Sequence, residues 1–297
     1  MLTLPRRISE SVMRWLDAVI QGILLGGTYA QYALGMALMF GVMRIVNIAH
    51  GDLIIFLALI GISLASAFGL GPFTVMVLLV PLGAAIGWLL QRVVLNRVIG
   101  DDPLPSIIAT FGLSIALQNL MLQVWSADTR SLPGGGVEAA SIQLGGVYLG
   151  ILPLMGLGVA ILLTAGLDAL LRFTRFGRSL RSAAADVEAA TITGVNPWSV
   201  YASATAIAVG ILGVAAVFQS LRATVSPSDG PAQLLYAFEA VIIGGLGSIW
   251  GAFLGSSVLG IAQAVGFRID PGWGVLAGHV VFLAVLATRP RGLMSRG

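Results

Sequence analysis

The sequence of 297 residues has no cysteine, and charged residues make up only 10% of it. Without cysteine there is neither a disulfide framework nor a thiolate metal site, so the redox compartment cannot be inferred. A soluble domain of this length needs far more charge on its surface. Hydrophobic residues make up 57% of the chain and gather in repeated runs of membrane-span length. The sequence therefore predicts an integral membrane protein.

Lysine is also missing, because all 16 basic residues are arginine. The arginines stand at the ends of apolar runs, as the positive-inside rule expects, and form no continuous basic stripe of the kind that binds nucleic acid. The first residues, MLTLPRRISESVMRWLD, carry charge but have no cleavage site after a short apolar core. We therefore expect a retained cytoplasmic N-terminus and no signal peptide.

Histidine is scarce as well, with only His50 and His279, and the acidic residues are scattered. No Ser/His/Asp spacing suggests a catalytic triad. No lysine follows the glycines between 244 and 260, so a phosphate-binding loop is a poor interpretation and close helix packing a better one. The sequence predicts neither a metal site nor catalytic activity in this chain.

The first apolar run, 18–43, is too long for one ordinary span, and glycines interrupt it. It forms either one strongly tilted helix or two short segments. Further apolar runs are expected at 53–68, 73–90, 105–125, 147–171, 200–221, 232–245, 250–267 and 274–288.

Charge counting favours two segments in the first run. Arginines that should face the cytoplasm occur near the N-terminus, at 92–97, at 172–181 and at 289–296. All four groups of arginines can face the cytoplasm only if 18–43 supplies two segments and 232–267 supplies two more. This predicts ten segments, or eight full spans plus broken pieces, in an all-α polytopic membrane protein with both termini in the cytoplasm.

Two groups of four segments, within 31–125 and 200–288, flank a central span and a polar stretch. Each group has an interruption at a corresponding place, NIAHGD at 47–52 and GGLGS at 244–248. Paired breaks in pseudo-symmetric halves point to a binding site or pathway near the middle of the membrane.

The polar stretch 172–198, RFTRFGRSLRSAAADVEAATITGVNPW, is called the polar island below. Its spacing predicts a short helix with small and apolar residues on one face (Leu180, Ala183, Ala184, Val187 and Ala190) and charges on another. Gly194, Asn196 and Pro197 end this helix. The island is either a linker resting on lipid headgroups or a helix that docks into a groove of a partner.

Polar residues inside apolar sequence are the candidates for a pathway. Asn47, His50 and Asp52 must face protein or water. They line a path, or else Asn47 and Asp52 cap two helix ends. Glu239 is ionisable within a span, so it marks a functional site or complements a helix dipole. Other amides in the spans, such as Gln263, are expected to bond between helices. The candidate pathway residues are Tyr29, Gln31, Asn47, His50, Asp52, Gln118, Glu239, Gly244, Gly245 and Ser248.

Several motifs occur together in a fixed order along nearly the whole chain. They are GTYA at 27–30 with ALG at 33–35, FGVMR at 40–44 running into 47–52, IATFGLS at 108–114 with LQN at 117–119, Arg181 with Ala184, Asp186, Ala189, Ala190 and 194–196, Phe238 with 244–248 and 251–252, and RPRGL at 289–293. Jointly they resemble the permease subunits of branched-chain amino acid ABC importers, the hydrophobic amino acid uptake family.

The resemblance implies one transmembrane permease domain over 1–297 in the bacterial inner membrane. It implies a pore of two such permeases, usually non-identical, with two cytoplasmic ATPase subunits and a periplasmic or lipid-anchored solute-binding protein. This chain would bind no cofactor, since ATP and magnesium belong to the ATPase subunits. The island would be the cytoplasmic coupling region that inserts into the ATPase through Arg178, Arg181, Ala184, Asp186, Glu188, Gly194 and Asn196.

The chain departs from the family pattern at Gln31, Phe40 and 96–98 (NRV), which leaves the substrate open. Branched-chain or related small amino acids are expected, while relatives also import urea, amides and small carboxylates. Two other classes remain: an ion-gradient transporter using Glu239 or Asp52, and a passive channel with Asn47 and Ser248 as its filter. Neither needs a docking element after the central span.

Overall fold

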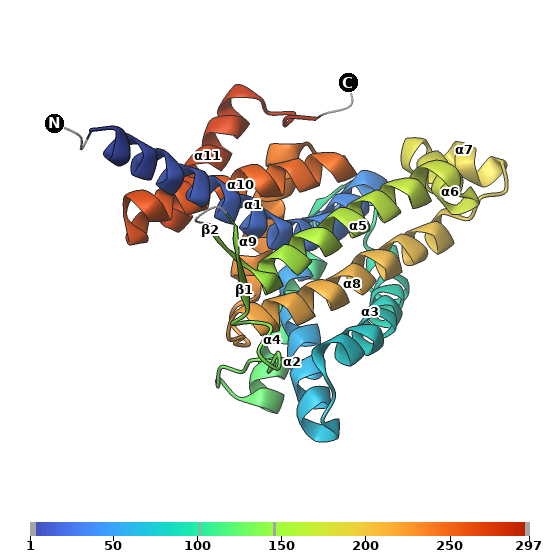
Figure 1. Ribbon diagram of the computed structural model, residues 1–297. Coiled ribbons are helices and arrows are strands. Elements are labelled where there is room, and N and C mark those ends of the chain that lie inside the picture. Colours follow the sequence, from blue (N-terminus) through green and yellow to red (C-terminus); the bar gives the residue numbers. More distant parts are fainter. Residues whose placement is uncertain (1–3, 101, 145–146, 295–297) are drawn as a thin grey trace.

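The computed structural model describes residues 4–100, 102–144 and 147–294, and over these residues it is almost entirely helical (Figure 1). The helices are α1 (Leu4–Met43), α2 (His50–Phe68), α3 (Pro72–Val93), α4 (Leu104–Trp125), α5 (Ile151–Phe173), α6 (Arg175–Ala185), α7 (Val187–Ile192), α8 (Pro197–Arg222), α9 (Gly230–Gly244), α10 (Ile249–Ile269) and α11 (Gly274–Thr288). Strands β1 (Ser141–Leu144) and β2 (Val147–Gly150) form an antiparallel hairpin, with Ser141 opposite Gly150.

Eight of the described helices are long and apolar enough to cross a membrane, which confirms the all-α polytopic class. The shorter α9, with 15 residues, adds a broken piece. The alternative of eight full spans plus broken pieces is therefore confirmed. The count of ten segments is one too many, because the first apolar run forms one helix instead of two.

That first run is one continuous helix, α1, of 40 residues and about 60 Å. The prediction of two segments within 18–43 is wrong because its glycines serve helix packing instead of turns. A Cβ on Gly22 or Gly26 would clash with the backbone of α10 at Ile261 or Ser257, and one on Gly27 would clash with Leu157 of α5. Small residues at these positions let the helix backbones approach closely.

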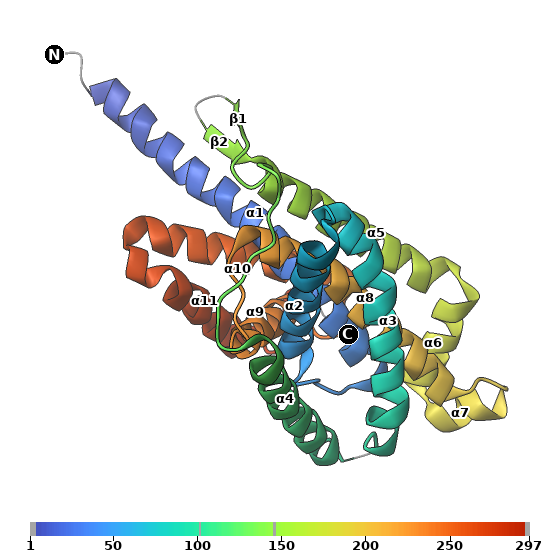
Figure 2. The ribbon, with the colours of Figure 1, turned by 90° about the horizontal axis from the view of Figure 1, so that it is seen from below.

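The two ends of α1 define opposite ends of the bundle. Leu38 and Gly41 lie beside the polar island and Met294, near the end of the described chain. Asp17, at the other end, lines a second cavity with Arg268 at the end of α10. The N-terminal part of α1 thus projects away from the island (Figure 2). The described ends of the chain, Leu4 and Met294, therefore lie at different ends of the bundle, which speaks against the prediction that both termini are cytoplasmic.

Both predicted interruptions coincide with helix ends. After Met43, Arg44 adopts a left-handed φ of 54°, and the chain runs back along α1 until α2 begins at His50. His50 Nε2 lies 2.9 Å from the carbonyl oxygen of Tyr32, which is about 16 Å along α1 from its end. α2 therefore begins inside the helix bundle, well back from the end of α1. The second break separates α9 from α10, at residues 245–248.

The most buried spans are α1 and α8, and α2, α9 and α10 pack around them. Helices α3, α4, α5 and α11 form the periphery (Figures 1 and 2) and expose apolar side chains such as Val77 and Leu162. The central span of the sequence, α5, is thus an outer helix in space. The equivalence of two pseudo-symmetric halves stays a prediction.

Candidate functional site

Asp52 occupies the point where α2, α4 and α9 meet. Ser114 Oγ of α4 donates to Asp52 Oδ2 at 2.5 Å, and Gln118 Nε2 donates to Ser114 Oγ at 3.1 Å. The other oxygen, Oδ1, has no hydrogen-bond partner among the described residues, and it lies against Gly230, the first residue of α9. The positive end of the α9 dipole favours a negative charge there. Asp52 therefore links α2, α4 and α9, and it does not cap the N-terminus of α2.

Asn47 lies in the turn before α2 without capping it, since the N-cap is Ala49, and His50 packs against α1. Asn47 Oδ1 accepts from the Ala49 amide at 3.1 Å, which supports the turn before α2. His50 is fully buried, and its ring contacts α1 at Tyr32 and Gly35. Asn47 Nδ2 and His50 Nδ1 lack hydrogen-bond partners among the described residues. Both residues fix the break against the bundle.

Glu239 forms a pair that the sequence did not suggest. Its Oε1 lies 2.5 Å from Nδ1 of His279 on α11, while Oε2 has no partner among the described residues. Glu239 stands in the third turn of α9, so it is too far from the N-terminus to complement the helix dipole. The only sequence signal for His279 was its rarity, as the second of two histidines, inside an apolar span.

Tyr29 and Gln31 hold α1 to its neighbours. Tyr29 Oη donates to Gln263 Oε1 on α10 at 2.6 Å, and its ring stacks on Tyr236 of α9 with centroids 4.8 Å apart. Gln31 Nε2 donates to the carbonyl of Gly156 on α5 at 2.9 Å. The expectation of bonds between helices is thus confirmed for Gln31 and Gln263, whereas Gln118 bonds within α4.

Gly244, Gly245 and Ser248 shape the turn between α9 and α10. Gly245 has a φ of 109°, which favours glycine, and the end of the chain packs on this turn. The amides of Leu293 and Met294 donate to the carbonyls of Ile243 and Gly244, each at 2.9 Å. Ser248 Oγ caps α10 by accepting from the Gly251 amide at 3.0 Å. These atoms are therefore engaged in holding the turn.

The polar island folds into two helices, not one, because Asp186 interrupts it. Asp186 Oδ1 accepts from the Ala189 amide at 2.9 Å and caps α7. Leu180, Ala183 and Ala190 are buried against the rest of the chain, whereas Val187, predicted to share their face, is 45% exposed because α7 turns away from the line of α6.

The island also ends where the sequence predicted. Gly194 has a φ of 82°, and Asn196 Oδ1 accepts from the Ser199 amide at 3.2 Å to cap α8. Arg178 and Glu188 stay exposed on the surface. The island is thus an ordered helical projection, capped at each of its turns.

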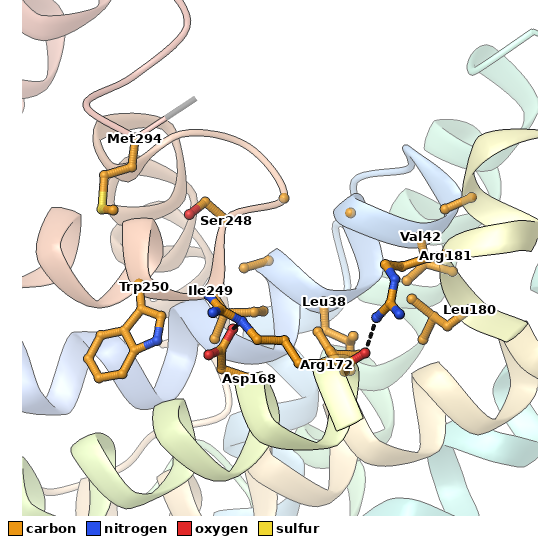
Figure 3. Close-up of a pocket in the computed structure, with 15 residues that line it drawn as sticks. Leu38, Val42, Asp168, Arg172, Leu180, Arg181, Ser248, Ile249, Trp250 and Met294 are labelled. Carbon is orange, nitrogen blue, oxygen red and sulfur yellow. Dashed lines mark hydrogen bonds and ion pairs between the residues drawn. The ribbon is translucent and has the colours of Figure 1, made fainter. Parts of the chain in front are cut away.

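A cavity of about 290 Å³ separates the island from the α9–α10 turn (Figure 3). It brings two predicted coupling residues, Arg181 and Ala184, together with the predicted pathway residue Ser248. Arg181 Nη1 donates to the carbonyl of Leu171, which ties α6 back to the end of α5. Gly244 and Gly245 belong to the same turn as Ser248, and the remaining predicted pathway residues lie deeper in the bundle. The structure thus divides the candidate site into an interior set and an island set.

The sequence singled out neither Ser114 nor Tyr32 as functional, although both make central contacts. Tyr32 Oη donates to Gln219 Oε1 of α8 at 2.6 Å, between the two most buried spans. Ser114 lies within the IATFGLS motif, whose inner face on α4 also carries the buried Ser106 and Thr110. A polar stripe on the protein-facing side of an otherwise apolar span was the signal that could have identified it.

The family described as "Branched-chain amino acid transport system / permease component" matches residues 18–286. The high-affinity branched-chain amino acid transport system permease protein BraD of Pseudomonas aeruginosa is 28% identical over 299 residues, covering 96% of this chain and 97% of BraD. LivH of Escherichia coli, with the same description, is 27% identical over 303 residues, covering 97% and 98%. A solved structure, PsaBC from Streptococcus pneumoniae in complex with Fab, has a TM-score of 0.44 and 19% identity, covering 94% and 91%, and is too distant to inform the fold.

Proposed function

Since this chain belongs to the family of permease components of branched-chain amino acid transport systems, we propose that it imports branched-chain or related small amino acids, as half of a translocation pathway. As a permease component of an ABC importer, it is not the subunit that hydrolyses ATP. The observation that carries the substrate proposal is the near-complete coverage of BraD and LivH, both described as branched-chain amino acid permeases.

The proposed partners are a second permease, two cytoplasmic ATPase subunits that bind ATP and magnesium, and an external solute-binding protein. Family membership favours this assembly over an ion-gradient transporter or a passive channel. The island supports an ATPase contact, because it is a capped helical projection with exposed charges at one end of the bundle. The island, residues 172–198, would then be the coupling region.

This proposal gives the chain an orientation in the bacterial inner membrane. The island and the C-terminal residues face the cytoplasm, together with Arg92, Arg97, Arg289 and Arg291 at the same end of the bundle, in keeping with the positive-inside rule. The N-terminal end of α1 faces the opposite side, so the arginines near the N-terminus depart from this rule.

In the proposed cycle, movement of the ATPase subunits displaces the island. Arg181 ties α6 to the end of α5, and the cavity places α6 beside the ends of α1 and α10. The displacement therefore reaches the two helices whose ends flank the breaks at 44–49 and 245–248. We assign Asp52, with Ser114 and Gln118, to the part of the path near the first break.

The substrate proposal is tested by uptake in cells that lack their own branched-chain importers and express the full transporter with its binding protein. Labelled leucine should accumulate, in competition with isoleucine and valine but not with urea or acetamide. Uptake should follow ATP supply and survive collapse of the ion gradients. Accumulation of urea or an amide without leucine would move this chain to the other branch of the family.

The coupling proposal is best tested at residues whose side chains do not hold the island together. Arg181 and Asp186 hold α6 and cap α7, so their reversal would disturb the island itself. Reversal of exposed Arg178 or Glu188 tests docking more cleanly. Arg178→Glu should lower uptake and substrate-stimulated ATP hydrolysis together, whereas Arg130→Glu, at the other end of the bundle, should leave ATP hydrolysis unchanged. Full activity of the Arg178 variant would contradict the docking assignment.

A further inference from the structure

The cavity beneath the island combines a cationic rim with an apolar wall. Arg172 and Arg181 reach it from α5 and α6, and Asp168 is the one acidic residue among those that line it. The apolar wall is formed by Ala37, Leu38, Val42, Leu171, Leu180 and Ile249. An occupant that satisfies both parts must be anionic at one end and hydrocarbon along its length.

The two arginines keep donors free for such an occupant. Arg172 Nε donates to Asp168 Oδ1 at 2.8 Å, and Arg181 Nη1 donates to the Leu171 carbonyl, as Figure 3 shows. A guanidinium has five N–H donors, so each arginine retains unused N–H groups. Asp168 offsets one of the two charges, and the positive end of α10, which begins at Ile249, adds to the remaining one.

The position of the cavity identifies where its occupant comes from. α1 and α5 end there and α10 begins there, so the cavity lies at the boundary between hydrocarbon and water. Trp250, which also lines it, is a residue type enriched at that boundary. Basic pockets between spans at this depth suit the headgroups of anionic lipids.

We propose that this cavity binds an anionic phospholipid from the leaflet on the island side. Arg172 and Arg181 hold the phosphate, and an acyl chain lies along Leu38 and Leu180. A bound lipid braces α6 against the ends of α1 and α10. This site goes beyond the transport of amino acids and does not depend on it.

The test uses the transporter purified from membranes through a tag on this chain. Mixed micelles with dioleoylphosphatidylglycerol or dioleoylphosphatidylcholine are titrated, and the melting temperature and the retained lipid are measured. Phosphatidylglycerol should raise the melting temperature and phosphatidylcholine should not. Arg172→Gln should weaken the apparent affinity about five- to tenfold, as expected for one charged contact with phosphate. Arg175→Gln, which alters an exposed arginine of α6 outside the cavity, should bind like wild type.

Three results would overturn the proposal. Equal responses to the two lipids would remove the headgroup specificity. Equal losses in the Arg172 and Arg175 variants would mean attraction to the surface as a whole. The same stabilisation by inorganic phosphate would make this a site for soluble anions. If Arg172→Gln does not fold, Ala184→Leu fills the cavity and keeps both arginines, and an undiminished response to phosphatidylglycerol in that variant would also overturn it.

Discussion

The contact between the first turns of α2 and α9 gives the sharpest test of the interior. Gly51 packs on the backbone of α9 so closely that an added Cβ would overlap the Gly230 carbonyl oxygen and lie 2.6 Å from the Leu234 amide nitrogen. Contacts under 3.0 Å are essentially never seen for real Cβ atoms, and here the obstacle is backbone. Gly51→Ala therefore forces α2 and α9 apart and moves Asp52 away from Gly230.

The expected cost is that of overpacking, about 1–3 kcal/mol. We expect the melting temperature of the purified transporter to fall by roughly 2–10 °C. Leucine uptake per folded molecule should fall as well, because Asp52 loses its place between the three helices.

Gly158→Ala in α5 is the matched control, because nothing lies within 4 Å of the Cβ that it adds. Within a helix this change should be neutral or stabilise the protein by up to about 1 kcal/mol. If Gly51→Ala has the same melting temperature and leucine uptake as Gly158→Ala, then α2 and α9 do not pack as closely as described. The position assigned to Asp52 between three helices would then be wrong as well.

Three further predictions concern other parts of the chain. Ser114→Ala leaves Asp52 Oδ2 buried without its donor, so it should destabilise the protein by about 1–3 kcal/mol and lower uptake, while Ser203→Ala, at a half-buried serine of α8 that bonds only within its own helix, should do neither. His279→Phe strands the buried Glu239 carboxyl and should lower the melting temperature more than the same change combined with Glu239→Gln; equal effects would refute the pairing. Because the chain has no cysteine, single introduced cysteines report topology. An impermeant maleimide should label Trp15→Cys from one side of the membrane and Arg178→Cys only from the other. Labelling of both variants from the same side would mean that the N-terminal part of α1 and the island face the same side.

The features that follow from local chemistry were predictable from the sequence. Membrane spans follow from apolar runs, and the breaks at 44–49 and 245–248 follow from polar and glycine residues that continuous helix disfavours. The end of the island at Gly194 and Asn196 was predictable for the same reason. These signals lie within a few residues of the feature they produce.

Features that depend on distant contacts were not predictable. Gly22, Gly26 and Gly27 read equally well as a turn or as a packing face, and only the presence of α5 and α10 beside them decides the question. The partner of Glu239 lies 40 residues away on another helix. Charge counting led to two segments within 18–43, whereas α1 is one helix there.

The unbroken α1 has a mechanical consequence. A helix of about 60 Å exceeds the hydrocarbon thickness of about 30 Å, so its two ends reach both aqueous faces of the membrane. With no hinge between Leu4 and Met43, it can respond to a push only by tilting or sliding as a stiff rod. A tilt of about 5° moves one end relative to the other by about 5 Å over this length. A rearrangement beside the island can thereby be transmitted along α1 to the far surface, where α1 contacts β2.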